Sequence, residues 1–234
     1  MKRQIAITGA SRGLGLCLSK NYLEQGCQVY ALVRSRSPRL LELQERFPKT
    51  LALISCDVSN TESVESAARQ LGEMTGHLDL LINNAGVNLD LNAPVTFEHT
   101  DFDRLGDTFT VNTAGPLRVL KALYPLLSQG STAVAISSAA GSITYCGGIE
   151  VEYAYRMSKA ALNMGIRLFA NTAEKKGIRT LLLDPGWMKT DMGGPGAFCD
   201  VEENARLIVA LLDRLDQVPQ DVLFLNYQGE PVPW

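Results

Sequence analysis

The sequence predicts an α/β fold in which helices cover both faces of a doubly wound parallel sheet. Apolar runs of strand length alternate with segments of helical periodicity along all 234 residues. The strand-length runs are nearly continuous in apolar character, as strands buried on both faces of a sheet are. Such alternation is typical of right-handed strand-helix-strand crossovers, which build a parallel sheet. Neither an internal repeat nor a linker divides the chain, so we expect one domain over residues 1–234.

The strand candidates are short apolar runs, and helical segments lie between them. In chain order the candidates are QIAIT (4–8), QVYALV (28–33), LALIS (51–55), LDLLIN (78–83), TAVAIS (132–137), IRTLLLD (178–184) and VLFLN (222–226).

The predicted helices have recognisable ends. The first runs from about Gly13 to Gln25 and stops at Gly26, a residue that suits the position after a helix C-terminus. Another follows Ser59, with Glu62 placed three residues later as its capping-box partner. The remaining helices are expected over about 101–128 with an interruption or bend near Pro116, through Lys159 to Gly177, and over about 201–215.

Composition excludes several classes of function. The formal net charge is −3 and no basic stripe appears, which argues against nucleic acid as a partner. No uninterrupted apolar stretch reaches the length that spans a membrane. The five cysteines are scattered without a close pair, which favours reduced thiols and a cytoplasmic location. His77 and His99 lack partners at metal-ligand spacing, so we expect no metal site.

The glycine-rich stretch TGASRGLG (8–15) follows the first strand and opens the first helix. Gly9, Gly13 and Gly15 would permit a tight turn, close approach of a pyrophosphate to the backbone, and close helix packing. The helix N-terminus would offer unpaired N–H groups to phosphate. The first gap between glycines is one residue longer than in the common dinucleotide fingerprint, and a merely glycine-rich turn is the alternative. Its place in the first crossover favours a dinucleotide.

The end of the second strand bears on the choice between NAD and NADP. An acidic residue normally binds the ribose hydroxyls of NAD there, but this strand ends Val33-Arg34-Ser35-Arg36. Arg34 and Arg12 would converge on the 2′-phosphate of NADP, for which guanidinium groups are well suited. The alternative is that Arg34 and Arg36 are solvated loop charges.

EYAYRMSKAALN (152–163) holds two tyrosines and one lysine. Tyr155 and Lys159 are four residues apart and share one helix face, whereas Tyr153 has Met157 at that offset. A nearby ammonium favours ionisation of a phenol, so Lys159 would lower the pKa of Tyr155 towards neutrality. Alone this pair is a weak signal, and Tyr155 as an ordinary residue of an amphipathic helix is the alternative.

Seven motifs taken together resemble the short-chain dehydrogenase/reductase superfamily. They are TGASRGLG (8–15), CDV (56–58), NNAG (83–86), VN (111–112), ISS (136–138), YRMSK (155–159) and DPGWMKT (184–190), in the order and approximate spacing of that superfamily. SITYCGG, PGWMKTDMGG and the QGEPVPW ending are most similar to the C-factor and sniffer-type carbonyl reductases. The resemblance implies a single Rossmann-type domain, with a dinucleotide-binding part over about 1–137 and a catalytic and substrate-loop part over about 138–234.

The resemblance also implies catalytic roles. Tyr155 would be the acid in reduction and the base in oxidation, and Lys159 would lower its pKa and hold the nicotinamide ribose. Ser138 would bind the substrate carbonyl, and Asn112 would hold a water that links Lys159 to solvent. Ser137 is a rival to Ser138, but successive strand side chains face opposite ways, and the family pattern favours the second serine.

The implied cofactor is NADP(H), held by residues from both parts of the chain. Asp57 and Val58 would flank the adenine, and the ribose wall would consist of Asn84, Ala85 and Gly86. The full implied set is Gly9, Ser11, Arg12, Gly13, Leu14, Gly15, Arg34, Asp57, Val58, Asn84, Ala85, Gly86, Asn112, Tyr155, Lys159, Pro185, Gly186, Met188 and Thr190.

Two loops are expected to shape substrate entry. Ser138 and Tyr155 are 17 positions apart, more than in many members of the superfamily, and Tyr145 lies in the added loop. DMGGPGAFCD, which follows Thr190, is either a small substrate lid or a plain surface loop. Trp187 is expected to pack at the pocket edge.

The function expected from these residues is reversible hydride transfer between NADP(H) and a carbonyl or alcohol, namely an aldehyde, ketone or quinone. The alternative is a C-factor-like signalling or regulatory protein that binds a nucleotide with little or no turnover. The presence of Asn112, Ser138, Tyr155 and Lys159 favours the enzyme. A scaffold that binds no nucleotide would leave the glycine loop unexplained. The resemblance implies a homodimer or homotetramer, whereas the substrate itself does not follow from the sequence.

Overall fold

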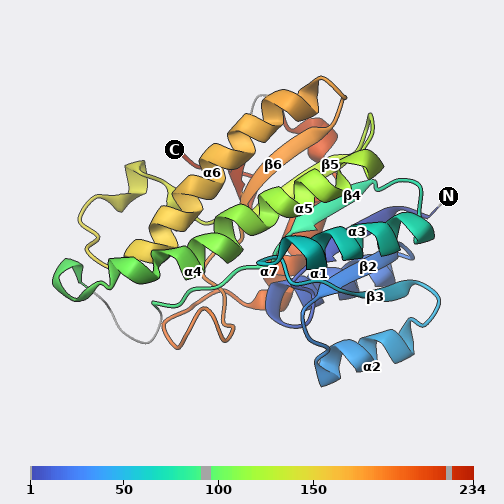
Figure 1. Cartoon of the computed structure of the whole chain (residues 1–234), viewed down its shortest axis with the longest axis horizontal. Helices are drawn as coiled ribbons and strands as arrows, with labels where there is room; N and C mark the ends of the chain where they lie inside the picture. The colour runs from blue at the N-terminus through green and yellow to red at the C-terminus, as the bar shows by residue number, and fades with distance from the viewer. Residues whose placement is uncertain (1, 91–95, 220–222) are drawn as a thin grey trace.

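A seven-stranded sheet with every strand pair parallel forms the centre of the computed structural model, which describes residues 2–90, 96–219 and 223–234 (Figure 1). The strand order is β3-β2-β1-β4-β5-β6-β7. The strands match the predicted ranges to within two residues, and Val222, where the last prediction begins, lies outside the described residues. Their bounds are Gln4–Thr8 (β1), Gln28–Val33 (β2), Leu51–Ser55 (β3), Leu80–Asn83 (β4), Thr132–Ile136 (β5), Arg179–Asp184 (β6) and Phe224–Asn226 (β7).

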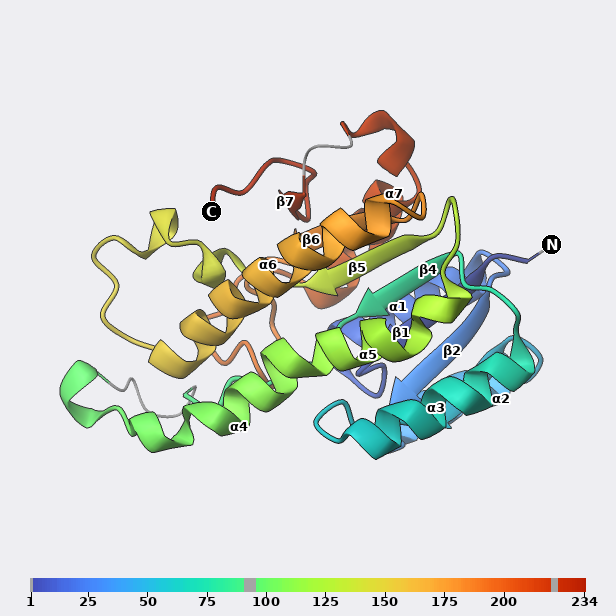
Figure 2. The ribbon, with the colours of Figure 1, turned by 45° about the horizontal axis from the view of Figure 1, so that its top comes forward.

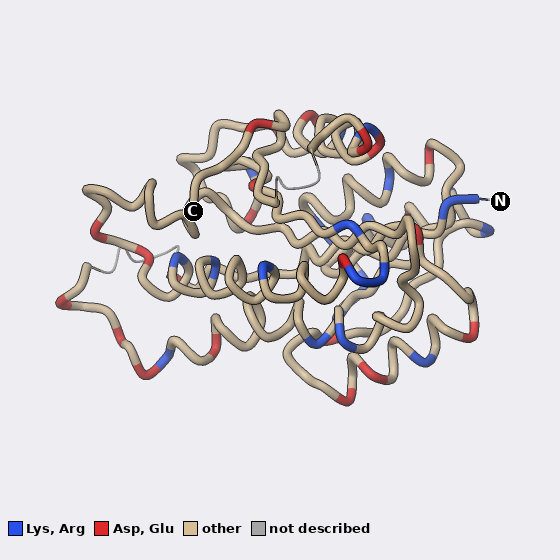
Figure 3. Tube along the Cα trace, turned by 90° about the horizontal axis from the view of Figure 1, so that it is seen from above, with Lys and Arg blue, Asp and Glu red and all other residues tan. Residues whose placement is uncertain are grey.

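Helices cover both faces of this sheet, as the sequence predicts. One face carries α1 (Gly13–Glu24), α2 (Pro38–Arg46) and α7 (Val201–Leu212). The other carries α3 (Thr61–Met74), α5 (Gly115–Leu123) and α6 (Tyr153–Glu174), which run side by side in Figure 2. None of the helices in the described part of the chain combines the length and apolarity that crossing a bilayer requires. Basic and acidic residues are interspersed along the trace (Figure 3).

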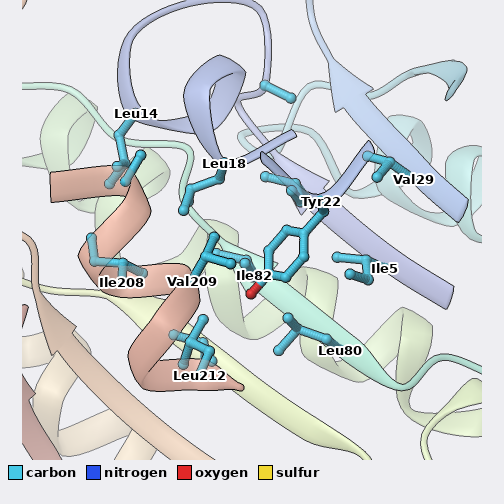
Figure 4. Close-up of a cluster of buried hydrophobic side chains, with 14 of the residues drawn as sticks. Ile5, Leu14, Leu18, Tyr22, Val29, Leu80, Ile82, Ile208, Val209 and Leu212 are labelled. Atoms are coloured by element: carbon cyan, nitrogen blue, oxygen red, sulfur yellow. The ribbon is translucent and has the colours of Figure 1, made fainter. Parts of the chain in front are cut away.

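Each face has its own apolar core. In the first, Leu18 and Tyr22 of α1 meet Val209 of α7 over the sheet residues Ile5 and Leu80 (Figure 4). All of these side chains are at most 3% exposed. Two cores of this kind fix the sheet between rigid layers, and they therefore fix the carboxyl ends of its strands relative to one another.

The long helix expected over 101–128 is interrupted, as Pro116 predicts. A short α4 (Leu105–Phe109) runs into a π-helical turn at Thr110–Ala114, and α5 begins at Gly115. Proline cannot donate the backbone hydrogen bond that a regular helix needs at that point. Wide turns of this type are frequent at functional sites, and this one carries Asn112.

Three details of the helices differ from prediction. The cap of α3 is Asn60, which accepts from the Ser63 N–H at 2.8 Å, and not Ser59 with Glu62. Helix α2 was not predicted, because it is short and strongly charged, although Ser37 caps it and Pro38 opens it. The last helix ends at Leu212 rather than near residue 215.

Candidate active site

The carboxyl ends of the strands open onto a cavity of about 1120 Å³. Open parallel sheets bind ligands at the carboxyl ends of their strands, at the point where the strand order reverses. In this sheet that point lies between β1 and β4. Among the predicted site residues, Gly15 and Asn112 lie behind the cavity wall. The others line it: Gly9, Ser11, Arg12, Gly13, Leu14, Arg34, Asp57, Val58, Asn84, Ala85, Gly86, Ser138, Tyr155, Lys159, Pro185, Gly186, Met188 and Thr190.

The glycine loop is built for close backbone approach. Gly9 and Gly13 have φ values of +66° and +54°, a region that favours glycine. A Cβ atom on Gly15 would lie 2.5 Å from the Gly9 carbonyl oxygen and from the Asn84 side-chain nitrogen. The third glycine therefore packs α1 against the loop that follows β4. The N-terminus of α1 is left facing the cavity, where it can receive phosphate.

The NNAG segment is fastened to the glycine loop by hydrogen bonds. The Thr8 hydroxyl accepts from the backbone N–H groups of Asn84 and Ala85 at 2.9 and 3.0 Å. The Asn84 side chain donates in return to the carbonyl oxygens of Thr8 and Gly9. Two segments distant in sequence thus form one rigid wall of the cavity.

Arginines surround the end of the cavity next to β2. Arg34 follows β2, and Arg39 lies in the first turn of α2; both are exposed and line the cavity. Arg12 forms an ion pair with Asp191 at 2.9 Å, and both side chains are at least 75% exposed. Sequence reasoning missed Arg39, although the Ser37-Pro38 helix start could have placed it. Arg36 does not line the cavity and is a solvated loop charge.

The opposite end of the cavity holds Tyr155 and Lys159 on the first turns of α6. The Lys159 Nζ donates to the Ile136 carbonyl oxygen at 2.8 Å and lies 5.7 Å from the centroid of the Tyr155 ring. Ser138 forms a hydrogen bond with the Tyr155 side chain, which lowers the pKa of the phenol. Ser137 faces the other way and donates to the buried Asn163. The structure therefore brings Ser138, and not Ser137, to the tyrosine.

The pKa of Tyr155 differs from the one that its spacing to Lys159 predicts. Burial raises the pKa of Tyr155 to about 12 and lowers that of Lys159 to about 8. The lysine was expected to lower the pKa of the phenol. The lysine cation sits over the face of the ring, and desolvation of the phenol outweighs the other influences on it.

Asn112 occupies the π-helical turn and is fully buried. Its side chain accepts from the Val87 N–H at 2.8 Å and donates to the Val87 carbonyl and the Ser158 hydroxyl. These bonds fasten α6 to the segment after β4. The side chain thereby helps to hold Lys159 in place, and a role in binding a water stays a prediction.

Tyr153 lies outside the cavity. Its ring packs against Phe97 and Phe102, with centroid separations of 6.0 and 5.9 Å. The two tyrosines of the same helix turn therefore have different surroundings: Tyr153 packs with other aromatic rings, whereas Tyr155 faces Ser138.

An apolar mouth surrounds the end of the cavity that holds Tyr155 and Lys159. The Trp187 and Phe198 rings meet edge to face at 6.1 Å, and the Trp187 indole donates to the Gly193 carbonyl. Five large apolar side chains line the cavity while remaining at least 38% exposed: Tyr145, Ile149, Trp187, Met192 and Phe198. Both loops that were expected to shape substrate entry thus contribute to this mouth.

Glu152 was also missed by sequence reasoning. It is the one described residue other than glycine with positive φ, at +62°, and it immediately precedes α6. Its carboxylate accepts from Asn88 at 2.9 Å and from Arg156 at 3.0 Å. Strained backbone of this kind persists where surrounding contacts hold it, and here it sits three residues before Tyr155.

No group of three metal-ligating side chains suited to an ion occurs among the described residues.

Comparisons with known proteins identify the family. The short chain dehydrogenase family matches residues 3–196. C-signal of Myxococcus xanthus is 42% identical over 164 residues, which cover 68% of this chain and 95% of that protein. An NADPH-bound carbonyl reductase from chicken fatty liver superimposes with a TM-score of 0.88 at 32% identity, covering 100% of this chain and 99% of that one. For the carbonyl reductase Sniffer of D. melanogaster the TM-score is 0.85 at 29% identity, with both chains fully covered. The chain therefore belongs to the short chain dehydrogenase family and resembles its C-factor and carbonyl reductase branch.

Proposed function

We propose that this protein is an NADP(H)-dependent oxidoreductase that reversibly interconverts a carbonyl compound and its alcohol. The observation that carries the proposal is one continuous cavity with two chemically different ends. A helix N-terminus and a glycine loop suited to pyrophosphate lie near the arginines. A half-buried tyrosine and serine and a buried lysine lie at the other end.

The cavity suits NADP(H) in particular. No carboxylate ends β2, and Arg34 and Arg39 flank the place where a 2′-phosphate would enter, with Arg12 close by. Arginine binds phosphate through charge-assisted and often bidentate hydrogen bonds. The chicken carbonyl reductase, which superimposes on the whole chain, binds NADPH.

When bound, NADPH supplies the hydride. The residues of the catalytic end supply the proton and stabilise charge. As a carbonyl oxygen gains negative charge, the Tyr155 hydroxyl donates its proton to it, and the Ser138 hydroxyl donates a hydrogen bond. In the reverse direction the tyrosine accepts the alcohol proton. Lys159 and Gly86 form the wall beside them, where a Cβ on Gly86 would lie 3.8 Å from the lysine Nζ.

The apolar mouth supports substrates with an apolar body, such as aromatic or branched aldehydes, ketones and quinones. Exposed apolar side chains around a polar centre favour a ligand that covers them. The five cysteines are free, which supports the cytoplasmic location that we propose. Exposed Met164 and Leu168 on α6 support a homodimer or homotetramer.

The test is a screen of the purified protein against aldehydes, ketones and quinones, in which the loss of NADPH absorbance is followed. We expect turnover of at least one apolar carbonyl compound, and the loss of most of that turnover in the Tyr155→Phe protein. NADPH binding without turnover of any compound would contradict the enzyme.

That outcome would favour the second candidate, a regulatory protein that binds the nucleotide. The observation in its support is the 42% identity to C-signal. A regulatory protein could lose its catalytic side chains without harm to the fold. The presence of Ser138, Tyr155 and Lys159 together in one cavity therefore favours the enzyme.

A further inference from the structure

Lys159 is a buried cation, and its surroundings offer little to balance its charge. The side chain is 5% exposed, and its hydrogen-bond partner is the Ile136 carbonyl. An ammonium group can donate more than one hydrogen bond, and buried charges in proteins are normally paired. Among the described residues, Asp184 is the charged side chain whose field acts on Lys159.

The sheet places Asp184 at the level of that lysine. Asp184 ends β6, and Leu183 before it is in register with Ile136 of β5, whose carbonyl oxygen accepts from Lys159. The Leu183 carbonyl accepts from the Ser137 N–H at 2.8 Å, which locks the two strand ends together. The carboxylate lines the same cavity as Tyr155 and Lys159.

Backbone groups hold the carboxylate in this position. It accepts from the Ala139 N–H and, at 3.4 Å, from the Gly186 N–H. Gly186 has a φ of +78°, and a Cβ there would lie 2.9 Å from the Tyr227 ring and 3.0 Å from the Asn204 side chain. The turn after β6 is therefore fixed, and so is the direction of the acid.

We propose that Asp184 is a positioning residue whose carboxylate is the counter-charge of Lys159 and holds the proton on Tyr155, so that the site favours carbonyl reduction at neutral pH. The first part rests on the register of β5 and β6 and on the shared cavity, together with the field of Asp184 at Lys159. The second part, the preferred direction, rests on the oxidoreductase function proposed above.

The charge of Asp184 shifts the pKa values of Tyr155 and Lys159 in the direction that the proposal requires. The negative charge of Asp184 raises the pKa of Tyr155 and also that of Lys159, although burial is the larger influence on each. A raised pKa makes the ionised phenol scarcer at neutral pH, and the ionised phenol is the base that alcohol oxidation needs, so the charge disfavours oxidation relative to reduction. Burial raises the pKa of Asp184 itself, so its effect is absent in acid and appears as the pH rises through that pKa.

Other charged and titratable groups face this cluster. On α6 and just before it, Arg156 and Glu152 act on Tyr155 with opposite signs. Beyond β7, Tyr227 faces Asp184, and burial raises the pKa of that phenol, so it stays neutral. Tyr227 is in turn influenced by Cys199, which precedes α7, and by Glu203 on α7. At Lys159 itself, Asp184 is the charged group that acts on the ammonium among the described residues.

The test uses Asp184→Asn, which removes the charge and keeps an oxygen to accept from Ala139 and Gly186. Lysine is isotope-labelled, its signals are followed by NMR across pH, and the Lys159 signal is assigned from the Lys159→Arg protein. We expect the titration midpoint of Lys159 to fall by about 0.5–1 unit in Asp184→Asn. This measurement needs no substrate, so it decides the counter-charge even if no carbonyl compound is turned over.

The activity arm tests the preferred direction. In Asp184→Asn the pH above which reduction fails should fall by about the same 0.5–1 unit, and the ratio of alcohol oxidation to carbonyl reduction at neutral pH should rise about 3- to 10-fold. The matched control is Asp107→Asn, an exposed acid of α4 that does not line the cavity, which should leave both pH profiles in place.

A titration midpoint of Lys159 that is the same in Asp184→Asn as in the parent would overturn the proposal that Asp184 is the counter-charge of Lys159. A shifted midpoint with unchanged pH limits of catalysis would overturn the preferred direction. If Asp184→Asn does not fold, Asp184→Ser removes the same charge with a smaller side chain and is held to the same outcomes.

Discussion

The two ends of the cavity place cations in opposite environments. At the end next to β2, Arg12, Arg34 and Arg39 are exposed, and Arg12 is paired with an equally exposed acid. At the catalytic end, Lys159 is almost completely buried beside a half-buried tyrosine. Exposed charges are screened by water and salt, so they change selectivity without changing proton affinity much. A buried charge shifts pKa values and reduces the stability of the fold.

The largest effect is expected at the buried end. Tyr155→Phe should lower kcat/KM by about 10²–10⁴-fold, since it removes the proton donor, while the Kd for NADPH changes only a few-fold. Steady-state kinetics and a binding titration measure both. Tyr153→Phe is the matched control and should stay within a few-fold of the parent, because the ring that packs against Phe97 and Phe102 is kept. Equal losses in the two variants would contradict the assignment.

The second-largest effect is expected at the exposed end of the cavity, and it concerns the choice of cofactor. In competition kinetics, kcat/KM should favour NADPH over NADH by about one to two orders of magnitude, and the preference should weaken with salt. Val33→Asp combined with Arg34→Ser should narrow or invert the ratio, because a new carboxylate repels the 2′-phosphate and accepts from the ribose hydroxyls.

Arg39→Ala and Arg36→Ala sharpen this prediction as a pair. Of these two arginines, Arg39 lines the cavity and Arg36 does not, so Arg39→Ala should reduce the preference for NADPH and Arg36→Ala should leave it in place. Equal use of the two cofactors by the parent protein, or an equal effect of the two alanine variants, would show that the exposed arginines do not select the cofactor.

A smaller effect concerns fold stability. Burial lowers the pKa of Lys159 to about 8 from its usual 10.5, so the folded state carries an unfavourable charge below pH 8. Lys159→Met should therefore raise the free energy of unfolding by about 1–2 kcal/mol at neutral pH. As the pH rises from about 8 to 10.5, the native lysine loses its proton before the unfolded one does, so the parent gains stability and the difference shrinks. Denaturant titrations at several pH values measure this, and a difference that grows over that range would have the wrong sign.

The smallest effect is expected for the Arg12–Asp191 pair. Both side chains are at least 75% exposed, so Asp191→Asn should change the free energy of unfolding by at most about 0.5 kcal/mol. Thermal unfolding at low and high salt checks this. A loss comparable to the change at Lys159 would mean that exposure does not separate the two ends of the cavity.

Much of this arrangement could be predicted from the sequence. The alternation of apolar runs predicted the sheet, because parallel strands are buried on both faces. The ordered motifs predicted which strand ends meet. Strand alternation predicted that only one of Ser137 and Ser138 faces the site, and the family pattern favoured Ser138.

The remaining features depend on three-dimensional surroundings that no local pattern records. Helix α2 is too short and too charged for periodicity to reveal, so Arg39 was missed. The cap of α3 was misplaced because Ser59, Asn60 and Thr61 are adjacent and all suit that position. The pKa of Tyr155 depends on burial, which spacing along a helix does not report. Asp184 is a single acid without a spaced partner, so its role beside Lys159 follows only from the register of β5 and β6.

The most direct test of the account is whether the two ends can be changed separately. Binding of NADPH and NADH, together with turnover of one carbonyl substrate, would be measured for the parent, for Tyr155→Phe and for Val33→Asp/Arg34→Ser. We predict that Tyr155→Phe loses turnover and keeps the preference for NADPH, whereas the double variant loses the preference and keeps turnover with NADH. Loss of both properties in both variants would contradict the division of the cavity into an exposed end that selects the cofactor and a buried end that transfers the proton.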